Sequence, residues 1–230
     1  MKLLEIKNPW PQADRVFKYA LIEREKADSV TIDASQFDGV ILTPVETIVV
    51  TSTTHIPSLE LLGEETRLVG FPETDYISSE RTRYQIKIGR VRDIGKNESI
   101  NTEVLLEVAP QVVVGYGIDG VSKTFETIEK SNIPVIYNGD WVESTALGKA
   151  EWIKMFGALF DKSKKADSIF NAIERNYKDA KIIAQNASNQ PTVLAGAMHK
   201  DVWYLPSGTS PEAQFLKDAN VNYLWQDTSE

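Results

Sequence analysis

Residues 147–187, LGKAEWIKMFGALFDKSKKADSIFNAIERNYKDAKIIAQNA, decide the fold. This stretch contains no strand pattern, and its apolar residues recur at the spacing of an amphipathic helix. Those residues are Trp152, Met155, Phe156, Leu159, Phe160, Ile169, Ile173 and Tyr177. Because polar residues from Asp161 to Ser163 interrupt the stripe, the sequence predicts one long helix or two helices broken near Ser163.

Strand and helix patterns alternate on the N-terminal side of this stretch. The sequence predicts a helix from Asn101 to Val108, with Asn101 as its N-cap residue. Continuous apolar runs predict buried strands at Thr47–Thr51, Arg67–Phe71, Gln111–Tyr116 and Ile133–Tyr137. Such alternation is typical of a parallel sheet covered by helices on both faces.

Strand signals begin again on the C-terminal side, at Thr192–Ala197 and Val202–Leu205, and a helix signal follows at Pro211–Ala219. We therefore predict an α/β fold of two Rossmann-like lobes joined by a long rigid helix. So short a second lobe cannot bury enough surface to be stable alone. We expect it to be truncated here and the native chain to continue beyond Glu230.

The predicted organisation has four parts. Residues 1–46 form an N-terminal extension, residues 47–146 a first binding lobe, residues 147–190 the interlobe helix, and residues 191–230 the start of a second binding lobe. The start of the chain has no apolar core of a signal peptide and no cleavage site. If the protein is exported, its signal sequence is absent from this chain.

Composition excludes several classes of function. The net charge is −8 and no basic patch is present, which argues against nucleic acid as a partner. The absence of cysteine excludes disulfides, thiolate metal sites and cysteine nucleophiles. No G-x-S-x-G or H-E-x-x-H motif occurs. We therefore predict a protein that is not an enzyme, with no catalytic residues, no metal ligands and no cofactor.

Several segments resemble the class III substrate-binding proteins of ABC importers, which bind cobalamin, haem and iron–siderophores. Residues 51–63 (TSTTHIPSLELLG) and 200–210 (KDVWYLPSGTS) look like those of Bacteroidetes-type iron-chelate binders. The other matching segments are 48–52, 61–63, 68–70, 101–106 running into 110–114, 133–135 and the long helix. Gln111 departs from the family pattern, which has aspartate at this position.

The resemblance implies a protein that binds an iron–siderophore, haem or cobalamin-like ligand in a cleft between the lobes and delivers it to the permease of the inner membrane. Glu103 matches the first-lobe glutamate that docks on permease arginines; the alternative is a carboxylate favoured by the helix dipole. The resemblance also implies a periplasmic protein, either with or without a lipid anchor, and we expect a monomer.

Candidate ligand-binding residues follow the ends of predicted strands, where parallel sheets bind ligands. Two histidines, His55 and His199, occupy related places after the first strand of each lobe, and both are expected at the cleft as contacts for a chelate or haem iron. The alternative is a pair of partly exposed loop histidines. Aromatic candidates, suited to planar ligands, are Tyr76, Tyr116, Trp141, Trp203 and Tyr204.

Two further patterns leave alternatives open. Gly115-x-Gly117-x-x-Gly120, with Asp140 after the next strand, has the outline of a dinucleotide-binding motif, so a dinucleotide-dependent oxidoreductase is the alternative function. Bulky Tyr116 between the glycines weakens that interpretation. An arginine-rich stretch is either a contact for a chelate's carboxylates or a solvated surface. Its members are Arg81, Arg83, Arg90 and Arg92.

Overall fold

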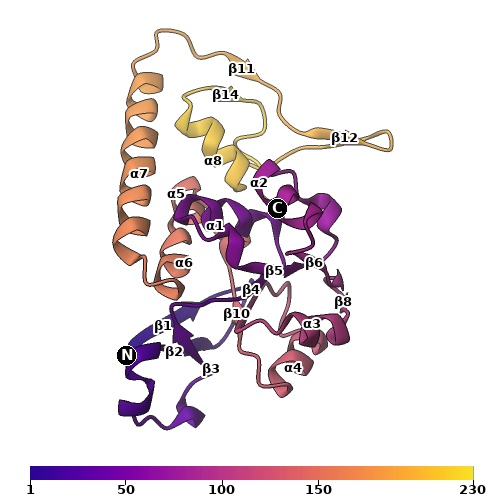
Figure 1. Ribbon diagram of the computed structural model, residues 1–230. Coiled ribbons are helices and arrows are strands. Elements are labelled where there is room, and N and C mark those ends of the chain that lie inside the picture. Colours follow the sequence, from indigo (N-terminus) through magenta and orange to yellow (C-terminus); the bar gives the residue numbers. More distant parts are fainter. Residues whose placement is uncertain (230) are drawn as a thin grey trace. The chain divides into compact units, whose positions relative to one another are not determined.

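The computed structural model describes residues 1–229, which divide into two compact units (Figure 1). The first unit contains Met1–Val142 and Trp152–Asp167. The second contains Glu143–Glu151 and the residues from Ser168 onward. Within the described residues, no helix has the length and apolarity needed to cross a bilayer.

A five-stranded parallel sheet forms the centre of the first unit. Its strand order is β10-β9-β4-β5-β6, so the first strand along the chain, β4, lies in the middle and later strands are added on both sides. The bounds are β4 (Ile48–Val50), β5 (Leu68–Phe71), β6 (Arg92–Asp93), β9 (Val112–Gly115) and β10 (Val135–Tyr137). This doubly wound order confirms the predicted α/β fold.

Helices cover both faces of this sheet, as the apolar strand runs require. Figure 1 shows α1 and α6 on one side of the sheet and α3 and α4 on the other. Asn101 caps α3 as predicted, because its side-chain oxygen accepts hydrogen bonds from the backbone N–H groups of Glu103 and Val104. The bounds are α1 (Ile56–Leu62), α2 (Glu80–Lys87), α3 (Thr102–Val108), α4 (Lys123–Lys130) and α6 (Ile153–Leu159).

Short elements complete the first unit. A two-stranded hairpin, β7 (Gly95–Lys96) and β8 (Ser99–Ile100), follows β6. The 3-10 helices are η1 (Arg24–Ser29), η2 (Ala34–Gln36), η3 (Thr53–His55), η4 (Glu65–Arg67), η5 (Thr74–Tyr76) and η6 (Asp140–Val142). Several of them lie at strand ends, where they redirect the chain into a helix.

The N-terminal residues form a separate three-stranded sheet of β1 (Lys2–Lys7), β2 (Val16–Glu23) and β3 (Gly39–Thr43). This sheet is part of the first unit and packs against the edge strand β10. The hydroxyl of Tyr19 accepts a hydrogen bond from the backbone N–H of Tyr137 (3.4 Å), and the ring of Phe17 lies 4.8 Å from that of Tyr137. The β10 edge of the parallel sheet is therefore covered, which protects this edge from pairing with other chains.

The helical stretch contains α5 (Ala146–Glu151), α6 and the 23-residue helix α7 (Ser163–Gln185). The interruption near Ser163 is confirmed, because α6 ends at Leu159 and α7 begins at Ser163. Helix α7 begins in the first unit and continues into the second.

The second unit contains two two-stranded sheets and α8 (Pro211–Asp218). One sheet pairs β11 (Thr192–Val193) with β14 (Asn222–Tyr223) in parallel, and the other pairs β12 (Ala197–His199) with β13 (Val202–Tyr204) in antiparallel. The continuous strand predicted over Thr192–Ala197 is wrong, because the chain bends between β11 and β12, where Gly196 has a φ of +119°.

Candidate functional site

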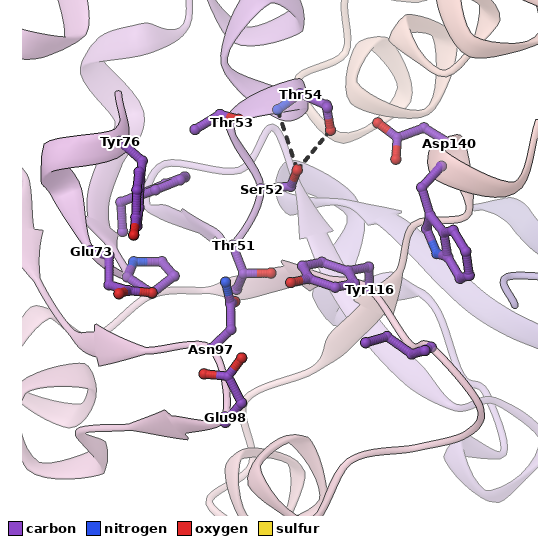
Figure 2. A pocket seen from close by; sticks show the side chains of 14 residues that line it. Thr51, Ser52, Thr53, Thr54, Glu73, Tyr76, Asn97, Glu98, Tyr116 and Asp140 are labelled. Atoms are coloured by element: carbon purple, nitrogen blue, oxygen red, sulfur yellow. Dashed lines mark hydrogen bonds between the residues drawn. The ribbon is translucent and has the colours of Figure 1, made fainter. Parts of the chain in front are cut away.

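All five strands of the parallel sheet end at one cavity of about 570 Å³ (Figure 2). Its wall is built from the loops that follow β4, β5, β9 and β10 and from the hairpin after β6. The lining residues are Thr51–Thr54, Phe71–Glu73, Tyr76, Asn97, Glu98, Tyr116, Ile118, Asp140 and Trp141. This is the carboxyl edge of the sheet, beside the reversal in strand order between β4 and β9, where open α/β sheets bind ligands.

The central part of the wall is Thr51–Thr54, which directly follows β4. The backbone N–H of Thr51 continues the ladder by donating to the carbonyl of Val114 (3.0 Å). The hydroxyl of Ser52 then caps η3 by accepting from the backbone N–H of Thr54 (3.3 Å). Thr51 is only 2% exposed, and its hydroxyl has no hydrogen-bond partner in the protein.

The loop after β5 is held by Asp93 at the end of β6. One carboxylate oxygen of Asp93 accepts from the backbone N–H of Thr74 (2.9 Å), and the other accepts from the N–H of Gly95 (2.8 Å). Burial opposes ionisation of Asp93, but these hydrogen bonds keep its pKa below the usual value. The loop therefore presents Glu73, whose φ is +52°, and Tyr76 to the cavity in a defined backbone conformation.

Three of the predicted aromatic residues, Tyr76, Tyr116 and Trp141, come together in this wall. Trp141 is fixed by a hydrogen bond from its indole N–H to the carbonyl of Gly117 (3.1 Å) and is still 39% exposed. Tyr76 is 71% exposed. Burial raises the pKa of Tyr116, and the carboxylates of Glu98 and Glu73 act in the same direction, so its phenol is neutral at physiological pH.

The charged residues of the lining are Glu73, Glu98 and Asp140, and no lysine, arginine or histidine lines the cavity. Among residues 1–229, none of these three carboxylates has an ion-pair partner within 4 Å. The cavity is therefore acidic.

The arginine-rich stretch does not supply a cation to the lining. Arg83 donates to the backbone carbonyls of Thr74 (3.4 Å) and Ile77 (3.2 Å), and Arg92 pairs with Glu107 (3.1 Å). The remaining two side chains, Arg81 and Arg90, are also absent from the cavity wall. The structure therefore favours the interpretation of this stretch as a solvated surface over its interpretation as a contact for the carboxylates of a chelate.

His55 does not line the cavity, although we expected it at the ligand site. It ends η3, and the turn directs its side chain into the core, where it is 1% exposed and its ring lies 5.7 Å from that of Phe156. Neither ring nitrogen has a hydrogen-bond partner in the protein. Burial lowers the pKa of His55 to about 4, against the opposing effect of Asp140, so its imidazole is neutral near pH 7.

The glycine motif has a packing explanation. A Cβ atom on Gly115 would lie 2.2 Å from the ring of Phe125, and one on Gly117 would lie 2.5 Å from the ring of Trp10. Helix α4 begins only at Lys123 and is capped by the side chain of Ser122. The glycines therefore admit aromatic side chains, and the interpretation as a dinucleotide-binding loop is not supported.

The other predicted ligand contacts belong to the second unit. His199 lies in β12, and Trp203 and Tyr204 lie in β13. All three are exposed, and Trp203 is oriented by a hydrogen bond from its indole N–H to the carbonyl of Ala195 (3.2 Å). Tyr204 lines an apolar hollow of about 450 Å³ within this unit. Their role as ligand contacts stays a prediction.

Glu103 lies in the first turn of α3 and is exposed. It does not line the cavity. Its position is compatible with contact to another protein, and its role in docking stays a prediction.

Several lining residues were missed by the sequence analysis. Asn97 and Glu98 form the turn of the β7–β8 hairpin, whose two-residue strands leave no periodic pattern. Their polar turn composition was the available signal. Thr51–Thr54 were missed as site residues, although their place after a buried strand marked them as candidates.

The sequence of residues 48–229 matches the family of periplasmic binding proteins. An uncharacterized lipoprotein of Methanocaldococcus jannaschii is 26% identical over 198 residues, which cover 82% of this chain and 47% of the relative. A second, uncharacterized protein of the same organism is 25% identical over 140 residues, covering 60% of this chain and 42% of that protein. The chain thus spans less than half the length of these curated relatives.

Solved structures show the same fold. A petrobactin-binding protein from Bacillus subtilis superposes with a TM-score of 0.63 at 15% identity, over 99% of this chain and 68% of the other. A periplasmic haem-binding protein of Vibrio cholerae superposes with a TM-score of 0.63 at 14% identity, over 77% of this chain and 65% of the other. At these identities the similarity concerns the fold.

Proposed function

Because the chain belongs to the periplasmic binding protein family, we propose that it is the solute-binding component of an ABC importer and binds a small metal chelate or corrinoid. The observation that carries this proposal is the aromatic-lined cavity at the carboxyl edge of the parallel sheet. The ligand classes are a ferric siderophore, haem and a cobalamin-like compound, and structural relatives bind petrobactin or haem.

The dimensions and chemistry of the cavity suit such ligands. A volume of about 570 Å³ is within the range of small-molecule sites. The rings of Tyr116 and Trp141 offer flat apolar surface, and the hydroxyls of Thr51–Thr54 offer hydrogen bonds that fix orientation. The volume, the aromatic rings and the hydroxyls are all features that a ligand-binding protein needs.

The second unit contributes further contacts in this proposal. Trp203, Tyr204 and His199 are side chains on short strands of this unit, and aromatic rings offer a large flat contact area to planar ligands. Replacing Trp203 with alanine is therefore expected to weaken ligand binding about tenfold, because one aromatic contact with the ligand is lost. The matched control is Trp225→Ala in the same unit, which is expected to leave affinity unchanged.

Glu103 is proposed to dock on an arginine of the permease. A surface charge of this kind sets orientation and association rate more than ligand affinity. Glu103→Arg is expected to abolish uptake while leaving ligand affinity unchanged. The control is Glu126→Arg, an exposed carboxylate in the first turn of α4, which is expected to preserve uptake. Loss of ligand affinity in the Glu103 variant would overturn the assignment.

We also propose an extracytoplasmic location and a monomeric state. The family and a relative described as a lipoprotein support the location. Gel filtration with light scattering tests the monomeric state.

Native mass spectrometry with absorbance tests the proposed function directly. The protein is incubated with a ferric siderophore, haemin or cobalamin, and a one-to-one complex with one class is expected. Trp141→Ala is expected to weaken that complex about tenfold, whereas Trp10→Phe, which retains a packed aromatic ring outside the cavity, serves as the control. Absence of a complex with all three classes would contradict the proposal.

A further inference from the structure

We propose that the cavity of the first unit selects metal complexes that carry a net positive charge and discriminates against anionic complexes of the same size. This inference rests on the proposed function, since it concerns which chelate the cavity takes. Three kinds of lining group bear on the charge of the ligand: carboxylates, aromatic rings and buried polar atoms without partners.

The carboxylates come from three separate loops. Figure 2 shows Glu73, Glu98 and Asp140 entering the cavity from different parts of its wall. Within the described part of the chain none of them is neutralised by an ion pair, and His55, the titratable base beside Asp140, is kept neutral by burial. An anionic ligand would meet three like charges, and a cationic ligand would be attracted by all three.

The aromatic rings favour the same ligand charge. The faces of Tyr76, Tyr116 and Trp141 carry negative electrostatic potential, which attracts cations within about 6 Å of a ring centre. Since Tyr116 is held in its neutral form, its phenol adds no charge of its own. Aromatic walls together with carboxylates are a combination that recognises ammonium groups and cationic complexes.

Two buried polar atoms in the wall point independently to a ligand that makes hydrogen bonds, and one of them requires a donor. The hydroxyl of Thr51 lacks a partner although the residue is only 2% exposed, and the side-chain carbonyl oxygen of Asn97 is buried and lacks a donor. A buried polar group without a partner is costly, so a ligand that supplies the missing bond gains affinity. An ammonium group or a metal-bound water supplies the donor that the Asn97 oxygen lacks, whereas a carboxylate or catecholate does not. The Thr51 hydroxyl can donate or accept, so it does not distinguish the charge of the ligand.

The test compares ligands that share one core and differ in charge. Ferrioxamine B carries a free ammonium group, its N-acetyl derivative is neutral, and its N-succinyl derivative ends in a carboxylate. Aquacobalamin, which is cationic, and neutral cyanocobalamin form a second series, and haemin with its two propionates is the anionic reference. Affinities are measured by quenching of tryptophan fluorescence at low and at physiological salt.

The cationic member of the series that binds is expected to bind at least about tenfold more tightly than its anionic or neutral counterpart at low salt, and the gap is expected to narrow as salt is added. In the triple variant Glu73→Gln/Glu98→Gln/Asp140→Asn, the affinities of the cationic complex and its counterpart are expected to differ by no more than about threefold. The control Glu25→Gln/Asp28→Asn/Glu126→Gln removes as many exposed carboxylates away from the cavity and is expected to preserve the gap.

The outcomes separate this inference from the proposed function. Tighter binding of the succinyl derivative than of ferrioxamine B, or tight binding of haemin with weak binding of both cationic complexes, overturns the charge selection and leaves the binding function standing. No binding of any complex overturns the proposed function and the inference with it. Circular dichroism of the triple variant confirms that a closed gap does not come from unfolding.

Discussion

The strands of the two units differ sharply in burial. Val49 and Val113, in the parallel sheet of the first unit, are completely buried, whereas Met198 and Trp203, in the β12–β13 hairpin of the second, are 66% and 46% exposed. The first set belongs to five strands covered by helices on both faces, and the second to a two-stranded ladder, which is marginally stable by itself. We therefore expect the first unit to contribute most of the stability, while the β12–β13 hairpin of the second exposes apolar side chains.

The largest expected effect comes from deleting side-chain volume in the buried sheet. Ile48 is fully buried in β4, so Ile48→Ala is expected to destabilise the first unit by about 3 kcal/mol through lost burial and a cavity. The equivalent truncation in the hairpin, Val202→Ala, removes a side chain that is 52% exposed and is expected to cost about 0.5 kcal/mol or less. Urea unfolding followed by hydrogen exchange on peptides of each unit measures both. Equal effects would abolish the contrast between the two regions.

The next effect concerns the two histidines, one buried in the first unit and one exposed in the second. The pKa of His55 is about 4 in the folded state, below its ordinary value of 6.5. Below pH 6.5 the unfolded chain therefore binds a proton that the folded chain does not. Stability falls as the pH drops from about 6.5 to about 4, by up to about 3 kcal/mol.

His55→Leu is expected to flatten this part of the pH profile, and it also removes two buried nitrogens that lack partners. His199→Gln, which removes the exposed histidine, is expected to retain the acid-dependent loss. Thermal unfolding between pH 4 and pH 8 measures the profiles. A His55→Leu profile as steep as that of the parent protein would contradict the buried, neutral state of this side chain.

The smallest expected change in stability concerns the glycine motif, in which Gly115 is closely packed and Gly120 is not. Gly115→Ala places a methyl group against the ring of Phe125 and is expected to destabilise the first unit by about 2 kcal/mol. Gly120→Ala serves as the control, because no atom lies within 4 Å of the added Cβ, and it is expected to change stability by less than about 0.5 kcal/mol. Chemical denaturation measures both. Similar costs at the two glycines would contradict the packing explanation.

Much of the first unit was predictable because its strands are buried on both faces. The continuous apolar runs around Ile48–Val50, Val112–Gly115 and Val135–Tyr137 mark such strands without reference to tertiary structure. Helix α2 and the β7–β8 hairpin were not predicted, since arginine-rich and two-residue elements carry little periodicity. The second unit was predicted less well, because its strands are short and exposed.

The candidate site was predictable in part. The structure brings Tyr76, Tyr116 and Trp141, which were predicted from strand ends, into the wall of one cavity, since parallel strands end at one edge. Their role as ligand contacts stays a prediction. The inward rotation of His55 depends on the 3-10 turn before α1, which the sequence pattern does not specify. The acidic character of the cavity depends on which loops meet there, and it emerges only when Glu73, Glu98 and Asp140 are placed around it.

The central claim is that the ligand binds at the carboxyl edge of the five-stranded sheet. Hydrogen exchange with and without the metal complex identified by native mass spectrometry tests it most directly. Peptides covering Thr51–Thr54, Tyr116–Ile118 and Asp140–Trp141 are expected to become protected, while those of the N-terminal sheet remain unchanged. A bound complex that leaves all three cavity segments unprotected would contradict the claim.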